Sequence, residues 1–256
     1  MTSMRSKVVI ALAALALVAA ATCLVRADVA TPRARWTMVR MESETVGITL
    51  GEKRVAVEAV FNMYNEGKAG PVRMGYPLGL FETELHDFAV TVDGKAVEGI
   101  RTENGTPEAE GPMGRMRPGG DSGGAESYRF EGPYKQWKVW DVPMESRAPK
   151  TIKVNYWVEP ARLKTAEKGD LLYYAYTLRT GATWKGKIEK AVITVTLDGV
   201  EPGRLMRVVP AGAVTAAEGK TLVWTMRDFK PADNIEIAFR PSAPLQAASL
   251  PAARQP

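Results

Sequence analysis

Alternation of apolar and polar residues is the feature of this sequence that most constrains its fold. The clearest runs are residues 55–63, 152–158 and 191–197. Because successive side chains of a strand point to opposite faces of a sheet, such runs give one buried face and one polar face. No segment repeats apolar residues at helical spacing over three turns, and the best helical candidate, residues 160–168, is short. The pattern predicts an all-β chain with antiparallel sheets.

Turn residues separate these runs. Asp93-Gly94 favours a type I′ hairpin turn because both residue types tolerate positive φ. Gly51-Glu52-Lys53, Asn65-Glu66-Gly67 and Asp198-Gly199 end other strand-like runs. Many short strands joined by such turns predict a β-sandwich, built from two packed β-rich parts.

Composition divides the chain further. Residues 102–127 hold seven glycines and three prolines and few apolar side chains. Such a segment buries too little apolar surface to offset the entropy lost on ordering, so we predict a disordered insertion. The alternating pattern is interrupted by a charged stretch near residue 163. We therefore predict one β-rich part over residues 28–163 and a second over residues 164–240. Residues 241–256 are rich in Pro and Ala and predict a disordered tail.

The N-terminal residues 1–27 have the layout of a cleavable signal peptide. Arg5 and Lys7 precede an apolar run over residues 8–21, and small or apolar residues stand just before Asp28. The run is shorter than the roughly 20 residues that span a bilayer. We expect a secreted or periplasmic protein that meets the membrane only through the uncleaved signal peptide.

Cleavage before Asp28 changes the charge and the redox chemistry. The mature chain would keep 31 of the 34 basic residues against 29 acidic ones, a net charge of +2 rather than +5. A net charge this small gives no indication of a nucleic-acid partner. The cut also removes Cys23, the single cysteine, so no disulfide stabilises the mature protein.

One segment carries a family resemblance. Residues 176–188 read YTLRTGATWKGKI, which has the form Y-x-L-x-T-G-x-x-W-x-G-x-I. Together with Trp140-Asp141-Val142-Pro143 and residues 222–237, this resembles a group of exported bacterial proteins that share a domain of unknown function. The resemblance spans residues 46–240 apart from the insertion, and implies an extracytoplasmic β-rich protein with no assigned chemistry.

The physical reading of this motif is structural. Tyr176 and Leu178 share one strand face with Leu172 and Tyr174. After Thr180, Gly181 would form a turn that a Cβ would resist, and Trp184, followed by Gly186, would fold back over the core.

A second string imitates a catalytic motif. Residues 120–124 read Gly-Asp-Ser-Gly-Gly, like the nucleophile segment of trypsin-like serine proteases. His86, the single histidine, lies only 36 residues before Ser122, and a glycine-rich insertion cannot hold a nucleophile in register with its base. We interpret the string as a chance match and the protein as non-enzymatic.

Other candidate chemistry is weak. After cleavage, one histidine and no cysteine cannot make a zinc site, so we expect His86 to be a loop or strand-edge residue. Carboxylates leave calcium open, but no Asp/Asn-rich calcium loop is present, and we expect no metal or other cofactor. Glu42 and Glu44, like Glu82 and Glu84, are spaced to share a strand face. Charges there more often form a solvated edge than a glycosidase pair.

Aromatic residues on polar strand faces are the better binding candidates. Trp157 shares its face with Lys153 and Asn155, Tyr173 lies on a polar face, and either Trp137 or its neighbour Trp140 should point outward. Such rings are either covered by another layer or exposed for a partner. We expect an exported interaction or accessory module of the cell envelope that binds a protein or a glycan. The alternatives are a carbohydrate-binding module and an envelope hydrolase.

Overall fold

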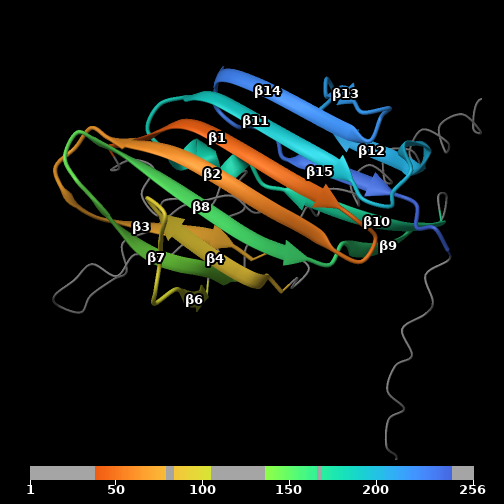
Figure 1. Ribbon diagram of the computed structural model, residues 1–256, viewed down its shortest axis with the longest axis horizontal. Helices are drawn as coiled ribbons and strands as arrows, with labels where there is room; N and C mark the ends of the chain where they lie inside the picture. Colours follow the sequence, from red (N-terminus) through yellow and green to blue (C-terminus); the bar gives the residue numbers. More distant parts are fainter. Residues whose placement is uncertain (1–37, 79–83, 105–135, 166–168, 244–256) are drawn as a thin grey trace, which may run out of the picture.

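The computed structural model describes residues 38–78, 84–104, 136–165 and 169–243, which form a sandwich of three sheets (Figure 1). This confirms the all-β sandwich. The large sheet has eight strands, in the order β13 (Val214–Ala216), β14 (Thr221–Phe229), β11 (Ile188–Leu197), β1 (Val39–Leu50), β2 (Val55–Asn65), β8 (Ala148–Val158), β4 (His86–Val92) and β5 (Lys95–Ala96).

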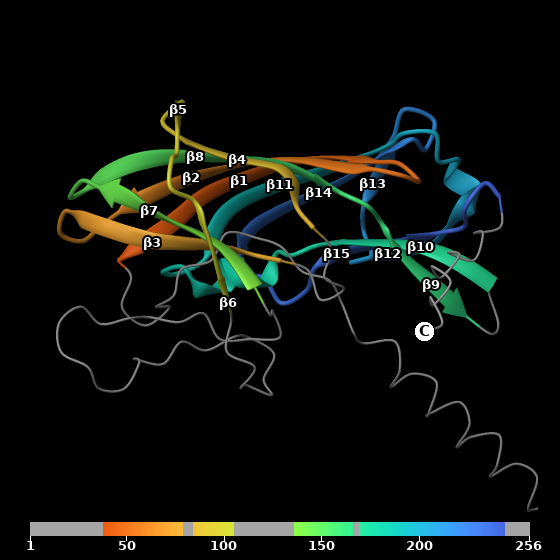
Figure 2. The same ribbon diagram turned by 90° about the horizontal axis from the view of Figure 1, so that it is seen from below.

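Two smaller sheets lie side by side as the second layer (Figure 2). One has the order β12 (Leu205–Val209), β15 (Ile235–Phe239), β10 (Gly169–Tyr176) and β9 (Ala161–Thr165). The other has the order β3 (Gly70–Pro77), β7 (Gln136–Met144) and β6 (Arg101–Asn104). The short 3₁₀ helices are η1 (Arg179–Thr183) and η2 (Pro202–Arg204).

One apolar core joins the three sheets. Alternate residues of β2, β8 and β11 are almost completely buried and pack against residues from both smaller sheets. Tyr156 of the large sheet marks the meeting point: its hydroxyl accepts a hydrogen bond from Tyr76 of β3 at 2.7 Å and lies 3.4 Å from the hydroxyl of Tyr174 of β10. The period-two pattern therefore identified the buried faces.

The two halves of the chain meet in the large sheet. β1 and β11 pair in parallel from Ser43↔Lys190 to Leu50↔Leu197, whereas the other pairings among the described strands are antiparallel. The boundary that the sequence suggested between residues 163 and 164 falls inside β9, which pairs with β10. The two β-rich parts thus share one sheet and one core.

Of three local predictions from the sequence, the structure confirms one and corrects two. The hairpin at Asp93-Gly94 is confirmed: both residues have positive φ, 49° and 79°, between β4 and β5. The helical candidate is wrong for residues 161–165, which form β9 because they pair with β10. The insertion was placed too early, since residues 102–104 belong to β6 and pair with β7.

The start of the expected tail is held against the sandwich. The backbone N–H and the hydroxyl of Ser242 each donate to the carboxylate of Glu52, at 3.0 Å. Residues 244–256, residues 105–127 of the expected insertion with Ser122, and residues 1–27 of the expected signal peptide with Cys23 lie outside the described residues. Within the described part, no helix is both long and apolar enough to cross a membrane.

Candidate functional site

An open hollow of about 490 Å³ lies on the outer face of the large sheet, the face turned away from the core. It crosses β11, β1, β2, β8 and the start of β4. Trp157 of β8 lies in its lining and is partly exposed, with Asn155 on the same strand face. The sequence left open whether Trp157 is covered by another layer or exposed, and the structure shows that it is partly exposed.

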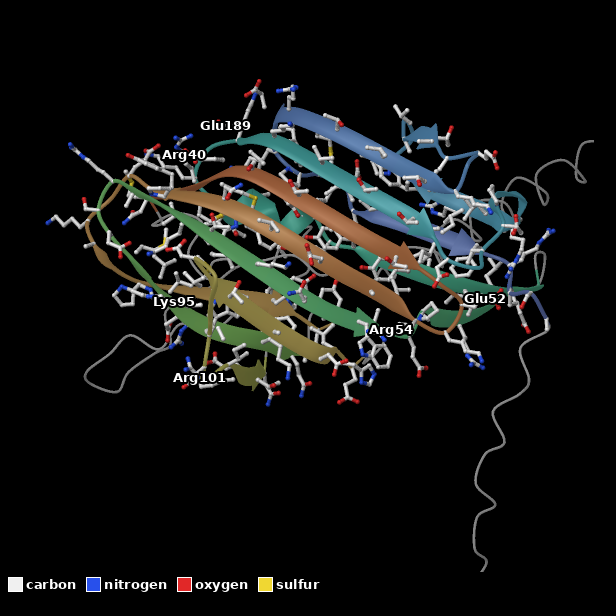
Figure 3. All side chains as sticks on the ribbon, in the orientation of Figure 1. Arg40, Glu52, Arg54, Lys95, Arg101 and Glu189 are labelled. Carbon is white, nitrogen blue, oxygen red and sulfur yellow. The ribbon has the colours of Figure 1, made fainter. Side chains whose placement is uncertain are left out.

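Two neighbouring segments hold the Trp157 ring. His86, which pairs with Trp157 across β4 and β8, stacks on it with ring centroids 3.9 Å apart and an interplanar angle of 19°. From the opposite side of β8, the guanidinium carbon of Arg54 lies 4.9 Å from the ring centroid, a cation–π contact. His86 and Arg54 thus flank the tryptophan. Figure 3 shows Arg54 at the end of the large sheet opposite Arg40.

A β-bulge brings a carboxylate to the same ring. His86 pairs with Trp157 and Ala89 with Asn155, so Asp87 and Phe88 together lie opposite one residue of β8. Asp87 adopts a left-handed backbone with φ 53°, which Asp tolerates better than most residues. Its Oδ2 accepts a hydrogen bond from Trp157 Nε1–H at 2.8 Å. The bulge therefore fixes the orientation of the ring.

The rest of the hollow mixes apolar residues with several hydroxyl and amide groups. Thr49, Thr194 and Thr196 come from β1 and β11, and Asn155 adds an amide. Glu58 is also in the lining, and its Oε2 lies 2.7 Å from Lys153 Nζ in an exposed ion pair. These donors and acceptors could bind the hydroxyl groups of a ligand lying across the strands.

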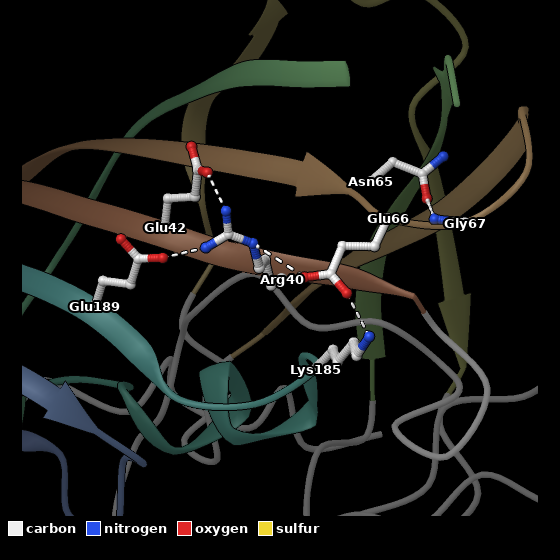
Figure 4. A network of polar contacts seen from close by, with 7 residues as sticks. All are labelled: Arg40, Glu42, Asn65, Glu66, Gly67, Lys185 and Glu189. Atoms are coloured by element: carbon white, nitrogen blue, oxygen red, sulfur yellow. Dashed lines mark hydrogen bonds and ion pairs between the residues drawn. The ribbon is translucent and has the colours of Figure 1, made fainter. Parts of the chain in front are cut away.

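A second arginine–aromatic pair lies at the other end of the same sheet face. Arg40 of β1 lies over the ring of Tyr64, at 5.1 Å from the centroid. Its guanidinium contacts Glu42 at 2.7 Å, Glu66 at 3.2 Å, and Glu189 (Figure 4). Three carboxylates thus surround this cation, and Lys185 also contacts Glu66. The network ties β1, β2 and the start of β11 together.

The structure corrects the other two aromatic candidates. Tyr173 is 5% exposed and packs with Ala175 and Ala238 on the outer face of the four-stranded sheet. Trp137 is 3% exposed, and so is not the outward member of its pair; Trp140 is buried too, at 1%. Alternation showed which faces these rings occupy but not that both faces are covered.

Most of residues 176–188 have the structural role that the sequence suggested. Tyr176, Leu178 and Trp184 are at most 2% exposed and belong to the main core. Thr180 and Gly181 lie in η1, where the Gly181 N–H donates to the Leu178 carbonyl. Gly181 forms a 3₁₀ turn, and the glycine of this segment with a left-handed backbone is Gly186, with φ 73°.

A buried carboxylate was missed by the sequence reasoning. A β-bulge between Met41 and Ser43 turns Glu44 into the core, where it is 1% exposed, whereas Glu42 stays at the surface. Tyr176 donates a hydrogen bond to Glu44 Oε1 at 2.8 Å. Burial raises the pKa of Glu44 to about 7, and the tyrosine opposes that shift only partly. The interpretation of Glu44 as part of a solvated edge is wrong.

In the described part of the chain, no group of three or more His, Cys, Asp or Glu residues is arranged so that it could hold a metal ion. His86 is the first residue of β4, in line with the expected strand-edge position, and its ring stacks on that of Trp157. Glu84 is exposed, and Glu82 lies outside the described residues.

Comparisons with known proteins show the fold alone. No protein-family model and no curated protein matches this chain. A solved structure from Legionella pneumophila, described as a proposed nutrient-binding protein, has a TM-score of 0.61 and 16% identity, covering 84% of this chain and 70% of that one.

Two weaker likenesses involve a metallopeptidase and a hydrolase. The M1 zinc metallopeptidase of Deinococcus radiodurans gives a TM-score of 0.37 at 14% identity, over 86% of this chain and 50% of that one. Yeast LTA4 hydrolase gives 0.42 at 8%, over 81% and 30%. Likenesses this weak carry no argument about activity.

Proposed function

We propose that this protein is an exported, non-enzymatic binding module of the cell envelope that holds a hydroxyl-rich ligand in the hollow beside Trp157. The observation that carries the proposal is the fixed tryptophan. Its N–H is bonded to Asp87 and its ring is flanked by His86 and Arg54, so an outward aromatic residue is already ordered before any ligand arrives. Such preorganisation lowers the entropy cost of binding.

The form and lining of the hollow support an extended ligand. It crosses five strands, and its threonine hydroxyls and the Asn155 amide are suited to sugar hydroxyls. Its carboxylates have partners: Asp87 accepts from Trp157, and Glu58 is paired with Lys153. A glycosidase would need two carboxyl groups aimed at one bond. The arrangement therefore favours binding over hydrolysis, and a glycan over an apolar peptide.

Trp157→Ala tests the site directly. The purified full chain would be applied to a glycan array and then titrated by calorimetry with the strongest hit. We expect the substitution to weaken that binding by about tenfold or more, because it removes a large side chain of the lining that also positions Arg54.

Tyr64→Ala is the matched control, because Tyr64 also lies beside an arginine on the outer face but at the far end of the sheet. It should leave the affinity within about twofold, since substitutions away from the site have small effects. Equal losses in both variants, or no glycan binding by the wild type, would rule out the hollow as a glycan site.

A further inference from the structure

The two arginines on the outer face of the large sheet differ in one respect. Arg40 and Arg54 both lie over aromatic rings, but Arg40 is surrounded by Glu42, Glu66 and Glu189. Within the part of the chain that the structure describes, no carboxylate oxygen lies within ion-pair distance of Arg54, and its side chain donates no hydrogen bond. Figure 3 shows the two at opposite ends of the sheet.

We propose that Arg54 binds a carboxylate of the ligand, and that the ligand is an acidic polysaccharide. This inference rests on the proposed function and specifies its substrate class. Arg54 is exposed and lines the hollow, while its contact with the Trp157 ring restricts the guanidinium to one region of it. A guanidinium held in this way still presents its planar set of N–H donors, which match the two oxygens of a carboxylate.

The other charged groups at the hollow are already engaged. Asp87 accepts the Trp157 N–H, and Glu58 is neutralised by Lys153. His86 is stacked against the far side of the tryptophan. Among the charged residues that line the hollow, Arg54 is therefore the one whose side chain has no ion-pair or hydrogen-bond partner within the described residues. An anionic group of the ligand would pair with Arg54 as the three glutamates pair with Arg40.

The neighbouring groups favour a sugar acid over an acidic peptide. Thr49, Thr194, Thr196 and Asn155 provide hydroxyls and an amide across the adjoining strands. A uronic acid carries a carboxylate and several hydroxyls on each ring, so it could use the arginine and this polar lining together. An acidic peptide could use the arginine but would bring few hydroxyls.

The test compares two polymers that differ in charge. Oligogalacturonate and its methyl ester share the same sugar rings, but only the first carries free carboxylates. We expect the full chain to bind oligogalacturonate at least tenfold more tightly, as charge-assisted hydrogen bonds allow. We expect Arg54→Gln to weaken oligogalacturonate binding about tenfold and to leave the weaker binding of the ester unchanged.

Two further variants isolate the role of the guanidinium. Arg54→Lys keeps the charge but loses the planar fork, so its affinity should fall between those of wild type and Arg54→Gln. Arg40→Gln removes an equal charge from the far end of the same face, and should bind as the wild type does. A thermal melt of each variant checks that the sandwich is intact.

The outcomes separate this inference from the proposed function. If both polymers bind equally and Arg54→Gln changes neither affinity, the anion inference is overturned while a glycan function stands. If an oligoglutamate peptide binds as tightly as oligogalacturonate, the assignment to a saccharide is overturned. If Trp157→Ala leaves the binding of every sugar polymer intact, the proposed function fails as well.

Discussion

Tyr156 and Trp157 are neighbours in β8, yet they belong to opposite faces of the large sheet. Tyr156 is 4% exposed and its hydroxyl lies in a buried set with those of Tyr76 and Tyr174. Trp157 is partly exposed and its polar atom is bonded to a surface carboxylate. On the inner face, polar groups must find partners within the protein; on the outer face, groups can keep donors for a ligand.

The same contrast applies to the charged residues. Glu44 on the inner face is buried, and burial raises the pKa of its carboxyl to about 7. Arg54 on the outer face stays exposed, so it can be charged without a protein partner. We therefore expect substitutions on the inner face to change stability and those on the outer face to change binding.

Trp184→Ala should have the largest effect on stability. Trp184 is 2% exposed in the main core, so its removal leaves a large cavity, and we expect a loss of about 3–5 kcal/mol in the free energy of unfolding. Urea denaturation followed by circular dichroism measures it. Trp157→Ala is the comparison on the outer face and should lose less than half as much. A smaller loss for Trp184→Ala than for Trp157→Ala would break the contrast between the faces.

Glu44→Gln should stabilise the protein, and the gain should depend on pH. The folded-state pKa of about 7 lies above the ordinary value of 4.5, so the stability of the wild type is fully present below pH 4.5 and falls as pH rises to about 7. The substituted glutamine would not ionise, and its carbonyl could still accept from Tyr176. We expect no gain at pH 4 and a gain of about 3 kcal/mol at pH 8.

Urea denaturation at a series of pH values measures this difference. Glu42→Gln is the matched control, since Glu42 belongs to the exposed Arg40 network on the same strand. Its effect should stay below about 1 kcal/mol, without a gain at pH 8. A pH-independent result for Glu44→Gln would mean that the carboxyl is not destabilised by burial.

Asp87→Ala should have the smallest effect on stability of the three. It removes the acceptor of the Trp157 N–H and places Ala in a left-handed conformation, at a cost of about 1–2 kcal/mol. Asp87→Asn keeps an acceptor and tolerates the same φ, so it should stay within about 0.5 kcal/mol of wild type. Thermal unfolding compares the two; equal losses would show that the Asp87 charge, rather than its hydrogen bond and backbone, matters.

Parts of the site were readable from the sequence. Alternation in β8 put Trp157 on the same face as Asn155, although it did not decide whether another layer covers that face. Arg54 gave no such signal, because it stands in a turn just before β2 and only the tertiary structure brings it beside Trp157. Asp87 was hidden for another reason: its place depends on a β-bulge, which the alternation of β4 does not reveal.

The sequence alone indicated several of the strands, the Asp93-Gly94 turn and many of the residues that face the core, because these follow from side-chain alternation and local backbone preferences. Tertiary structure decided the parallel pairing of β1 with β11, the burial of Trp137 and Tyr173, and the inward turn of Glu44. The reason is that bulges and register depend on pairing between distant strands, and a shift of one residue moves a side chain to the opposite face.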